Sequence, residues 1–145
     1  ELAAVIGRTV KQVDEDAALD AVAGYCIGLD MTVRGSEDRS LRKSVDRYAV
    51  LGPWLTTAEE VADPDNLALE IAVNGEVRQR SNTGHLIFGL ARLIAYASRF
   101  YTLHPGDIIM TGTPEGVGPV RPGDVMSCHV QDVGDMQVEV RGDTE

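Results

Sequence analysis

Apolar and polar residues alternate over several short stretches of the chain, a pattern that predicts β-strands. Residues 1–7 read as a short buried strand, and Tyr25–Val33 reads as a second strand. In the second strand Ile27 and Leu29 share one face with every second residue after them, so Asp30 lies on the opposite face. A carboxylate in the middle of a strand requires water, a hydrogen-bond donor, a cation or a metal. Asp30 is therefore the first candidate for a functional group.

Turn signals separate the remaining strands. Residues 67–81 are the clearest case, because alternating apolar residues lead into Asn74-Gly75, the pair typical of a type I′ hairpin turn, and a return strand follows. Two Pro-Gly turns precede the strands that we expect over residues 108–113 and 125–130. The pattern closes with another alternating strand, expected over residues 136–142.

Helical spacing of apolar residues predicts two longer helices and a short one. The longer helices are expected over residues 13–25 and over His85–Phe100, where the apolar face is widest. A short capped helix is expected over residues 57–64. The stretch "VLGPWL" is interpreted as a turn beside the start of a strand, and the polar residues 35–48 as a loop with room for one helical turn.

These elements indicate an α+β fold. Two or three helices and about seven short strands are joined mainly by hairpins, without regular β–α–β alternation. We therefore expect mostly antiparallel or mixed sheets, curled into a sandwich or a roll. The chain has 145 residues and shows no internal repeat or linker, so a single domain over residues 1–145 is expected.

Composition and charge exclude several classes of protein. Hydrophobic residues make up 43% of the chain and charged residues 25%, which is ordinary for a globular protein. The net charge of −10 repels nucleic acid and anionic lipid, and the basic residues of the run 34–47 are interleaved with acidic ones. No stretch approaches the roughly 20 apolar residues of a membrane span. We therefore expect no nucleic-acid partner and no membrane association, and a small anionic substrate fits better.

The two cysteines and the first residues add further expectations. Cys26 and Cys128 are far apart and lie among apolar residues, so we interpret them as buried free thiols of a protein in a reducing cytoplasm. The sequence begins with "ELAAVIG", inside an expected strand and without Met. We expect that residues upstream of Glu1 are missing from this sequence, together with any part of a site that they contribute.

Two interpretations of Asp30 are open. A strand carboxylate is most often paired, here with a backbone N–H or with Arg34. Alternatively, Asp30 is a ligand of a hard cation, and Glu1, at the edge of another expected strand, supplies a second carboxylate. Oxygen ligands without a cluster of Cys or His favour Mg²⁺, Mn²⁺ or Ca²⁺ over zinc.

Two loops carry the other candidate groups, and each also has a plain interpretation. The run "RGSEDRSLRKS" is either a solvated surface loop or a flexible anion-binding segment, in which Arg34 and Lys43 reach a substrate carboxylate or a developing oxyanion. The segment "TGTPEGVGPV" is either a tight surface turn or a loop that offers backbone N–H groups and the hydroxyls of Thr111 and Thr113 to a carboxylate.

An ordered set of motifs resembles the fumarylacetoacetate hydrolase family and spans nearly the whole chain. The motifs are "ELAAVIGR", "GYCIGLDMTVRG", "RKSVDRYAVLGPW", "VNGEVRQRSNT", "LIAYASRFYTLHPGDIIMTGTPEGVG" and "RPGD". The motif "GLDMTVR" is most similar to the branch of acylpyruvases and oxaloacetate decarboxylases. The resemblance implies a mixed β-sandwich or β-roll, usually a homodimer, with one divalent cation, commonly Mg²⁺ or Mn²⁺.

The resemblance also implies roles for five residues. The family holds its cation with a Glu-x-Glu pair and an Asp; Glu1 matches the second Glu, Asp30 matches the Asp, and the first Glu would lie two residues before Glu1. Lys43 and Arg34 match residues that bind substrate and take part in catalysis, and Thr113 matches a residue that binds substrate. The lid His and Glu of the branches that cleave carbon–carbon bonds have no match here, which leaves the general base unassigned.

The activity that the resemblance implies is the hydrolysis of a C–C bond in a 2-oxo or β-diketo acid, such as an acylpyruvate or a fumarylacetoacetate-like acid. The cation and Lys43 would stabilise the enolate that forms when this bond breaks. Isomerisation of 2-hydroxyhepta-2,4-diene-1,7-dioate and decarboxylation of oxaloacetate share the enolate and are alternatives. A non-catalytic domain of the same fold is a further alternative.

Overall fold

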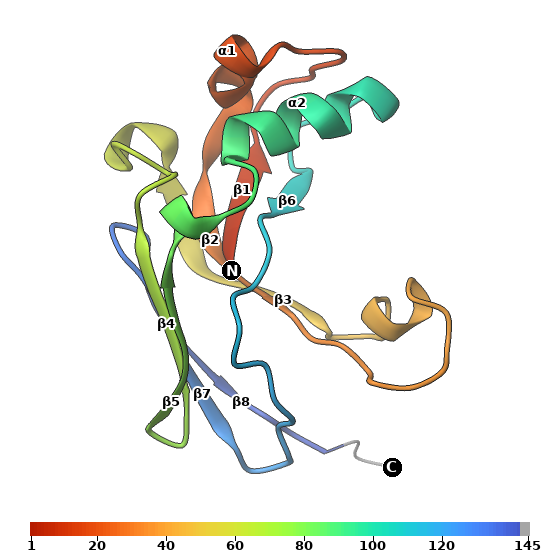
Figure 1. Cartoon of the computed structure of the whole chain (residues 1–145), viewed down its shortest axis with the longest axis vertical. Coiled ribbons are helices and arrows are strands. Elements are labelled where there is room, and N and C mark those ends of the chain that lie inside the picture. Colours follow the sequence, from red (N-terminus) through yellow and green to blue (C-terminus); the bar gives the residue numbers. More distant parts are fainter. Residues whose placement is uncertain (143–145) are drawn as a thin grey trace.

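Eight strands in two four-stranded sheets form the framework of the computed structural model, which describes residues 1–142 (Figure 1). The first sheet has the strand order β3-β2-β1-β6, and the second has the order β5-β4-β7-β8. Neighbouring strands pair antiparallel in both sheets. The predicted α+β class is therefore confirmed, and the sheets of this part of the chain are antiparallel rather than mixed.

The first sheet buries the apolar face that the sequence pattern predicts. Its strands are β1 (Leu2–Ile6), β2 (Val22–Asp30), β3 (Ala49–Thr57) and β6 (Ile108–Met110). Ile27 and Leu29 on β2 are 1% and 7% exposed. The strand ends at Asp30 instead of Val33, because the chain then folds back on itself in a loop where the Val33 N–H donates to the Arg42 carbonyl at 3.0 Å.

Two hairpins build the second sheet. Its strands are β4 (Ala68–Val73), β5 (Glu76–Asn82), β7 (Val125–Val130) and β8 (Gly134–Glu139). Asn74 and Gly75 have φ angles of 52° and 81°, the positive values that a type I′ turn requires, so the predicted hairpin is confirmed. β8 contacts β2 and β3, which brings the two sheets together. β6 and β8 end earlier than predicted, at Met110 and Glu139.

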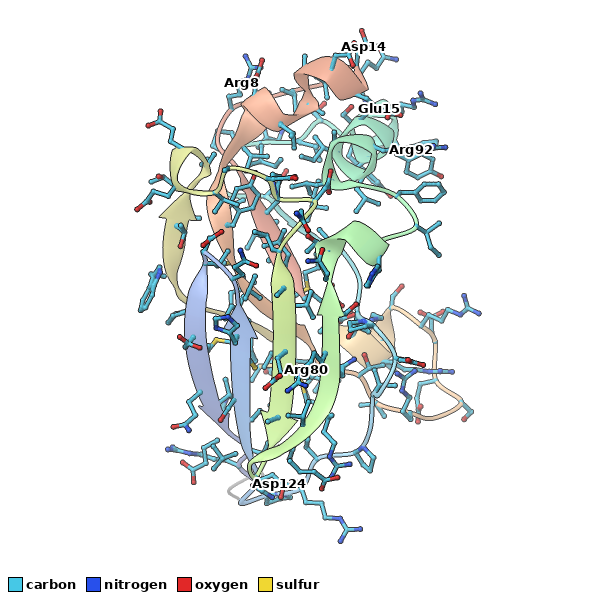
Figure 2. All side chains as sticks on the ribbon, turned by 60° about the vertical axis from the view of Figure 1, so that its left-hand side comes forward. Arg8, Asp14, Glu15, Arg80, Arg92 and Asp124 are labelled. Atoms are coloured by element: carbon cyan, nitrogen blue, oxygen red, sulfur yellow. The ribbon has the colours of Figure 1, made fainter. Side chains whose placement is uncertain are left out.

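Short helical elements complete the fold, and the two α-helices lie together at one end of the molecule (Figure 1). The helical elements are α1 (Glu15–Ala18), the 3₁₀ turns η1 (Leu19–Ala21), η2 (Leu41–Lys43), η3 (Ala58–Glu60) and η4 (Thr83–His85), and α2 (Leu90–Phe100). α1 packs against α2, and Figure 2 shows Asp14 and Glu15 at this end and Asp124 at the opposite end. Among residues 1–142, no helix has the length and apolar character to cross a bilayer.

The helix predicted over residues 13–25 is wrong in its second half. Helical residues end at Ala21, and β2 begins at Val22. Val22 pairs with Ile6 of β1, so the ladder with β1 captures residues whose local spacing favours a helix. Tertiary pairing overrides local propensity here.

The start of the long helix also differs from the prediction. η4 ends at His85, and α2 begins only at Leu90, after an extended N-cap at Gly89. The carboxylate of Asp65 accepts a hydrogen bond from the Leu90 N–H at 2.9 Å. Because the residue that satisfies this helix end is far away in sequence, local spacing over His85–Phe100 could not reveal the boundary.

The turn predicted within "VLGPWL" is wrong, because this stretch lies inside the edge strand β3. On β2, Tyr25 pairs with Thr56 but Ile27 pairs with Gly52, so β3 has extra residues at this point. Such a bulge on an edge strand accommodates Pro53, which has no N–H to donate. The short capped helix predicted nearby is confirmed in smaller form as η3, which has a capping box.

Candidate metal centre and substrate site

The first residue of the chain lies beside the end of β2. The Gly28 N–H donates to the Glu1 carbonyl, and the Glu1 amino group donates to the Gly28 carbonyl, both at 2.9 Å. Residues that face each other in this way direct their side chains to one side of the sheet, and Asp30 is two residues beyond Gly28 on that same side. The fold therefore places the carboxylates of Glu1 and Asp30 on one face, diagonally across two strands.

Gly28 keeps this face clear below Glu1. A Cβ atom at Gly28 would lie 2.7 Å from the terminal methyl group of Met110 and 3.2 Å from the Cβ atom of Ala3. The end of the flexible Met110 side chain would have to move away from such an atom, and Ala3 would have to shift by a few tenths of an ångström, so glycine is the residue that fits here without rearrangement. The small residue that separates Ile27 from Leu29 in the sequence thus has a structural cause.

Asp30 is paired with Lys43. The Lys43 Nζ atom forms an ion pair with Asp30 Oδ2 and lies 3.5 Å from the Thr32 hydroxyl. The side chain of Asp30 is 28% exposed and that of Lys43 is 51% exposed, so the pair remains accessible to solvent or a ligand. Lys43 comes from the η2 turn, which the fold-back of the loop after β2 brings next to the strand end. The strand carboxylate is therefore paired, but its partner is Lys43 and not the backbone N–H or the Arg34 that we expected.

Arg34 does not join this group. The side chain is exposed, and among residues 1–142 the structure gives it no hydrogen bond or ion pair. The predicted alternative in which Arg34 pairs with Asp30 is therefore wrong, because the loop turns back so that Lys43 takes that position.

The segment after β6 is fastened to the start of β1. The Glu1 carboxylate accepts a hydrogen bond from the Gly112 N–H at 2.8 Å. The N–H and the hydroxyl of Thr111 both donate to the Leu2 carbonyl, at 3.1 Å and 2.9 Å. Thr111 is buried and its hydroxyl is already bonded, so it does not offer that hydroxyl to a ligand, contrary to our expectation. The next threonine, Thr113, is exposed.

Thr113 borders a cavity of about 370 Å³ next to this segment. The cavity is bounded by the 111–114 segment, by the end of β5 with η4, and by Ile87, Phe88 and Leu93. Its lining is mostly apolar, and His85 is the only titratable residue in it. The hydroxyl of Thr113 accepts a hydrogen bond from the Gln79 side-chain amide at 2.9 Å. A mostly apolar lining with a few polar groups suits a small molecule, but Glu1, Asp30 and Lys43 are not among the lining residues.

The cysteines are not part of the candidate chemistry. Cys26 and Cys128 are free and buried, as predicted. Burial raises the pKa of both thiols above the ordinary value, which keeps them protonated at neutral pH. A protonated, buried thiol is a poor nucleophile and a poor metal ligand, so both cysteines serve packing.

The face that carries Glu1 and Asp30 offers oxygen donors, the type of ligand that a hard divalent cation prefers. Both side chains end in carboxylates, and both lie on one face of the sheet. Both residues are only partly buried, so their oxygens can be reached from solvent. Their number is small, since within residues 1–142 no three His, Cys, Asp or Glu side chains are grouped closely enough to hold a metal ion. Glu1 and Asp30 could therefore supply two ligands at most, and a cation at this face would need further oxygen donors.

Comparison with known proteins identifies the family. The family profile described as "Fumarylacetoacetate (FAA) hydrolase C-terminal" matches residues 1–141. The chain belongs to the fumarylacetoacetate hydrolase family. This finding confirms the resemblance that the ordered motifs indicate. A curated relative, the maleylpyruvate hydrolase of Aquipseudomonas alcaligenes, is 56% identical over 141 residues. The alignment covers 97% of this chain and 49% of that protein, so this chain spans about half the length of the relative.

Two further relatives widen the range of reactions and ligands in the family. The bifunctional isomerase/decarboxylase of 4-hydroxyphenylacetate degradation from Salmonella dublin is 44% identical over 92% of this chain and 32% of that protein. The crystal structure of maleylpyruvate hydrolase from Sphingobium sp. SYK-6, in complex with manganese(II) and pyruvate, superposes with a TM-score of 0.93. The two sequences are 47% identical, and the superposition covers 97% of this chain and 52% of the hydrolase chain.

Sequence reasoning missed two groups that the structure brings to the site. The Gly112 N–H contacts the Glu1 carboxylate, and the Gln79 amide contacts the Thr113 hydroxyl. Gln79 stands in a hairpin strand with charged neighbours, and only the close approach of β5 to the 113–115 segment distinguishes it from them.

Proposed function

We propose that this chain is the catalytic part of a divalent-metal-dependent hydrolase that cleaves a C–C bond in an acylpyruvate or a related β-diketo or 2-oxo acid. The observation that carries the proposal is the shared face of Glu1 and Asp30, with Lys43 paired to Asp30 and Thr113 one residue from the Gly112 N–H that contacts Glu1. The 56% identity to a maleylpyruvate hydrolase supports this reaction class.

Glu1 and Asp30 would hold the cation, for which we propose Mg²⁺ or Mn²⁺. The strand register supplies a further argument. Since Leu2 pairs with Ile27 and Glu1 faces Gly28, the position that would face Asp30 lies two residues before Glu1. A carboxylate at that position, as in the Glu-x-Glu pattern of the family, would complete a group of three on this face. A bound divalent cation supplies positive charge to the carboxylate and keto oxygens of a 2-oxo acid.

The side chains of the chain itself have defined tasks in this proposal. The Thr113 hydroxyl would donate a hydrogen bond to the substrate carboxylate, and Arg34 would help to position the substrate from the loop after β2. The ammonium group of Lys43 would stabilise the negative charge that develops on the keto oxygen of the pyruvyl unit. In hydrolysis, the bond between the acyl carbon and C3 of the pyruvyl unit breaks. Water supplies a hydroxyl group to the acyl carbon and a proton to C3.

Isomerisation or decarboxylation is the second candidate. The 44% identity to an isomerase/decarboxylase favours it. In both alternatives the same negative charge develops on the keto oxygen, so Lys43 and Thr113 would serve all three reactions equally. The reaction must therefore be decided by assay.

The decisive assay uses protein expressed from its complete reading frame. An acylpyruvate, oxaloacetate and a dienol dicarboxylate are each incubated with the protein and MnCl₂, and with EDTA in a parallel series. We expect metal-dependent turnover that is fastest for the acylpyruvate. Turnover of oxaloacetate or the dienol alone would replace hydrolysis by the second candidate, and no turnover of any of the three would overturn both.

A homodimer in the cytoplasm is the state that we propose for the protein. The edge strand β3 exposes Leu51, Trp54 and Leu55 at 40%, 59% and 47%, which is apolar surface available for contact with a second copy. Free cysteines are typical of a reducing compartment. Light scattering coupled to size exclusion tests the dimer, and a monomer at all concentrations would contradict it.

A further inference from the structure

One side-chain amide connects the second sheet to the loop that carries Thr113. The Nε2 atom of Gln79 lies 2.9 Å from the Thr113 hydroxyl oxygen, 2.6 Å from the Pro114 carbonyl and 3.3 Å from the Glu115 carbonyl. A carboxamide has two hydrogens to donate, so the two short contacts are its principal bonds. Gln79 therefore binds three consecutive residues of one loop.

The strand that carries Gln79 is held by a β-ladder, whereas the loop that carries Thr113 is not. Gln79 belongs to β5, where it pairs with Ile71 of the β4 ladder. The loop from Thr111 to Asp124 contains no helix or strand. A side chain on a paired strand is held more precisely than one on a loop, so the sheet provides the reference position for Thr113.

A second contact confirms that the loop lies directly against this strand. Gly116 has a φ angle of +98°, and a Cβ atom built on it would collide with the carbonyl oxygen of Arg78. The loop thus approaches β5 at two neighbouring strand residues, by a backbone contact at Arg78 and by the amide contact at Gln79.

The direction of the hydrogen bond has a chemical consequence. A hydroxyl group has one hydrogen to donate and two lone pairs. The Gln79 Nε2 group can only donate, so it occupies a lone pair of Thr113 and leaves the hydroxyl hydrogen free. Within residues 1–142 the structure gives this hydroxyl no acceptor of its own. The hydrogen is thereby available to an anionic oxygen that enters the cavity.

We propose that Gln79 is a positioning residue that orients the Thr113 hydroxyl to donate to the carboxylate of a 2-oxo acid. This inference rests on the proposed function, because it takes the substrate class from there. Gln79 acts through Thr113 and does not itself touch the substrate.

A double-mutant cycle tests the proposal in protein from the complete reading frame. The variants are Gln79→Leu, which keeps the size and loses the donor, Thr113→Val, and the two combined. The readouts are kcat and KM for the acylpyruvate and the Kd of pyruvate in the presence of MnCl₂. The control is Gln137→Leu, since Gln137 is exposed on β8 and, within residues 1–142, its side chain makes one long hydrogen bond, to the Ser127 hydroxyl at 3.4 Å.

The proposal predicts a specific pattern. Gln79→Leu weakens pyruvate binding and raises KM about five- to tenfold, as expected for one lost hydrogen bond, with little change in kcat. Thr113→Val has at least the same effect, and adding Gln79→Leu to Thr113→Val changes KM by less than about twofold, because coupled residues are not additive. The affinity for Mn²⁺ stays unchanged, and the control behaves like the wild type.

Two results would overturn the inference. If Gln79→Leu raises KM by the same factor with and without Thr113, the amide does not act through the hydroxyl. If pyruvate affinity is unchanged in Gln79→Leu, the amide only holds the loop. Should Gln79→Leu fail to fold, Gln79→Asn, which retains the amide on a shorter side chain, enters the same cycle. A wild type that binds pyruvate but turns over no acylpyruvate refutes the proposed function alone, and the pyruvate measurements still decide the role of Gln79.

Discussion

Replacing Asp30 by alanine should remove the response to divalent cations while leaving the fold nearly as stable as before. Asp30 forms an ion pair with Lys43, and the two side chains are 28% and 51% exposed. Partly exposed pairs contribute roughly 0–1 kcal/mol to the free energy of unfolding, because solvent screens them. The loss of this pair alone therefore lowers the free energy of unfolding by much less than its total, which is about 5–15 kcal/mol for a typical domain.

The effect on metal binding should be larger than the effect on the fold. A cation at 100 times its Kd stabilises the folded protein by about 2.7 kcal/mol. For a protein of some 150–250 residues, each kcal/mol corresponds to a change in Tm of about 2–4 °C. MnCl₂ should thus raise the Tm of the wild type by roughly 5–10 °C, and the Tm of Asp30→Ala by almost nothing.

Thermal unfolding with and without MnCl₂ measures both effects at once. The matched control is Glu70→Ala, since the carboxylate of Glu70 pairs with Arg80 of the second sheet. The side chains of Glu70 and Arg80 are 33% and 71% exposed, and Figure 2 labels Arg80 on its strand. We expect the control to lose a similar small amount of stability and to keep the full response to the metal. A strongly destabilised Asp30→Ala that still responds to MnCl₂ would refute the assignment of Asp30 as a ligand and identify the carboxylate as structural.

Three further changes test separate parts of the structure. Gly28→Ala should destabilise the protein by at most about 1 kcal/mol in a urea titration, because the flexible end of Met110 can move away from the new Cβ atom and only Ala3 is then crowded. The pKa of Asp124 is lowered by hydrogen bonds, first from the Arg121 backbone N–H. The stability that this carboxylate contributes is present above its ordinary pKa and is lost as the pH falls through the lowered value, so Asp124→Asn should flatten the acid side of the stability curve. Burial raises the pKa of the Cys128 thiol, so a thiol reagent at pH 8 should label it only after unfolding.

Each of these expectations has a contrary result. A loss of several kcal/mol in Gly28→Ala would mean that the Met110 side chain cannot move away from the new Cβ atom. An unchanged acid limb in Asp124→Asn would show that other carboxylates determine the pH dependence, and Glu60→Gln, which affects the capping box of η3, is the matched comparison. Rapid labelling of the native protein would show that the cysteines are accessible.

The sequence predicted those features that depend on neighbours in the chain. The alternation around Ile27 and Leu29 identified a buried strand face, and Asn74-Gly75 fixed the hairpin, because period and turn geometry are local properties. The motif order identified the family before the fold was known. The sequence placed Glu1 at the edge of one strand and Asp30 in another, and only the structure shows that these two strands are neighbours.

The features that were missed depend on contacts between distant residues. α2 begins at Leu90 because Asp65, twenty-five residues earlier, accepts its N–H. Lys43 rather than Arg34 pairs with Asp30 because the loop after β2 folds back. No local pattern records either contact, and tertiary structure alone determines them.

The central claim is that the carboxylates of Glu1 and Asp30 hold one divalent cation. Anomalous diffraction from crystals of the complete protein grown with MnCl₂ and pyruvate tests it most directly. We predict a manganese peak within about 2.6 Å of an oxygen of each carboxylate, the outer range of bonds to hard cations. A manganese peak bound elsewhere, with both carboxylates outside that distance, would contradict the claim.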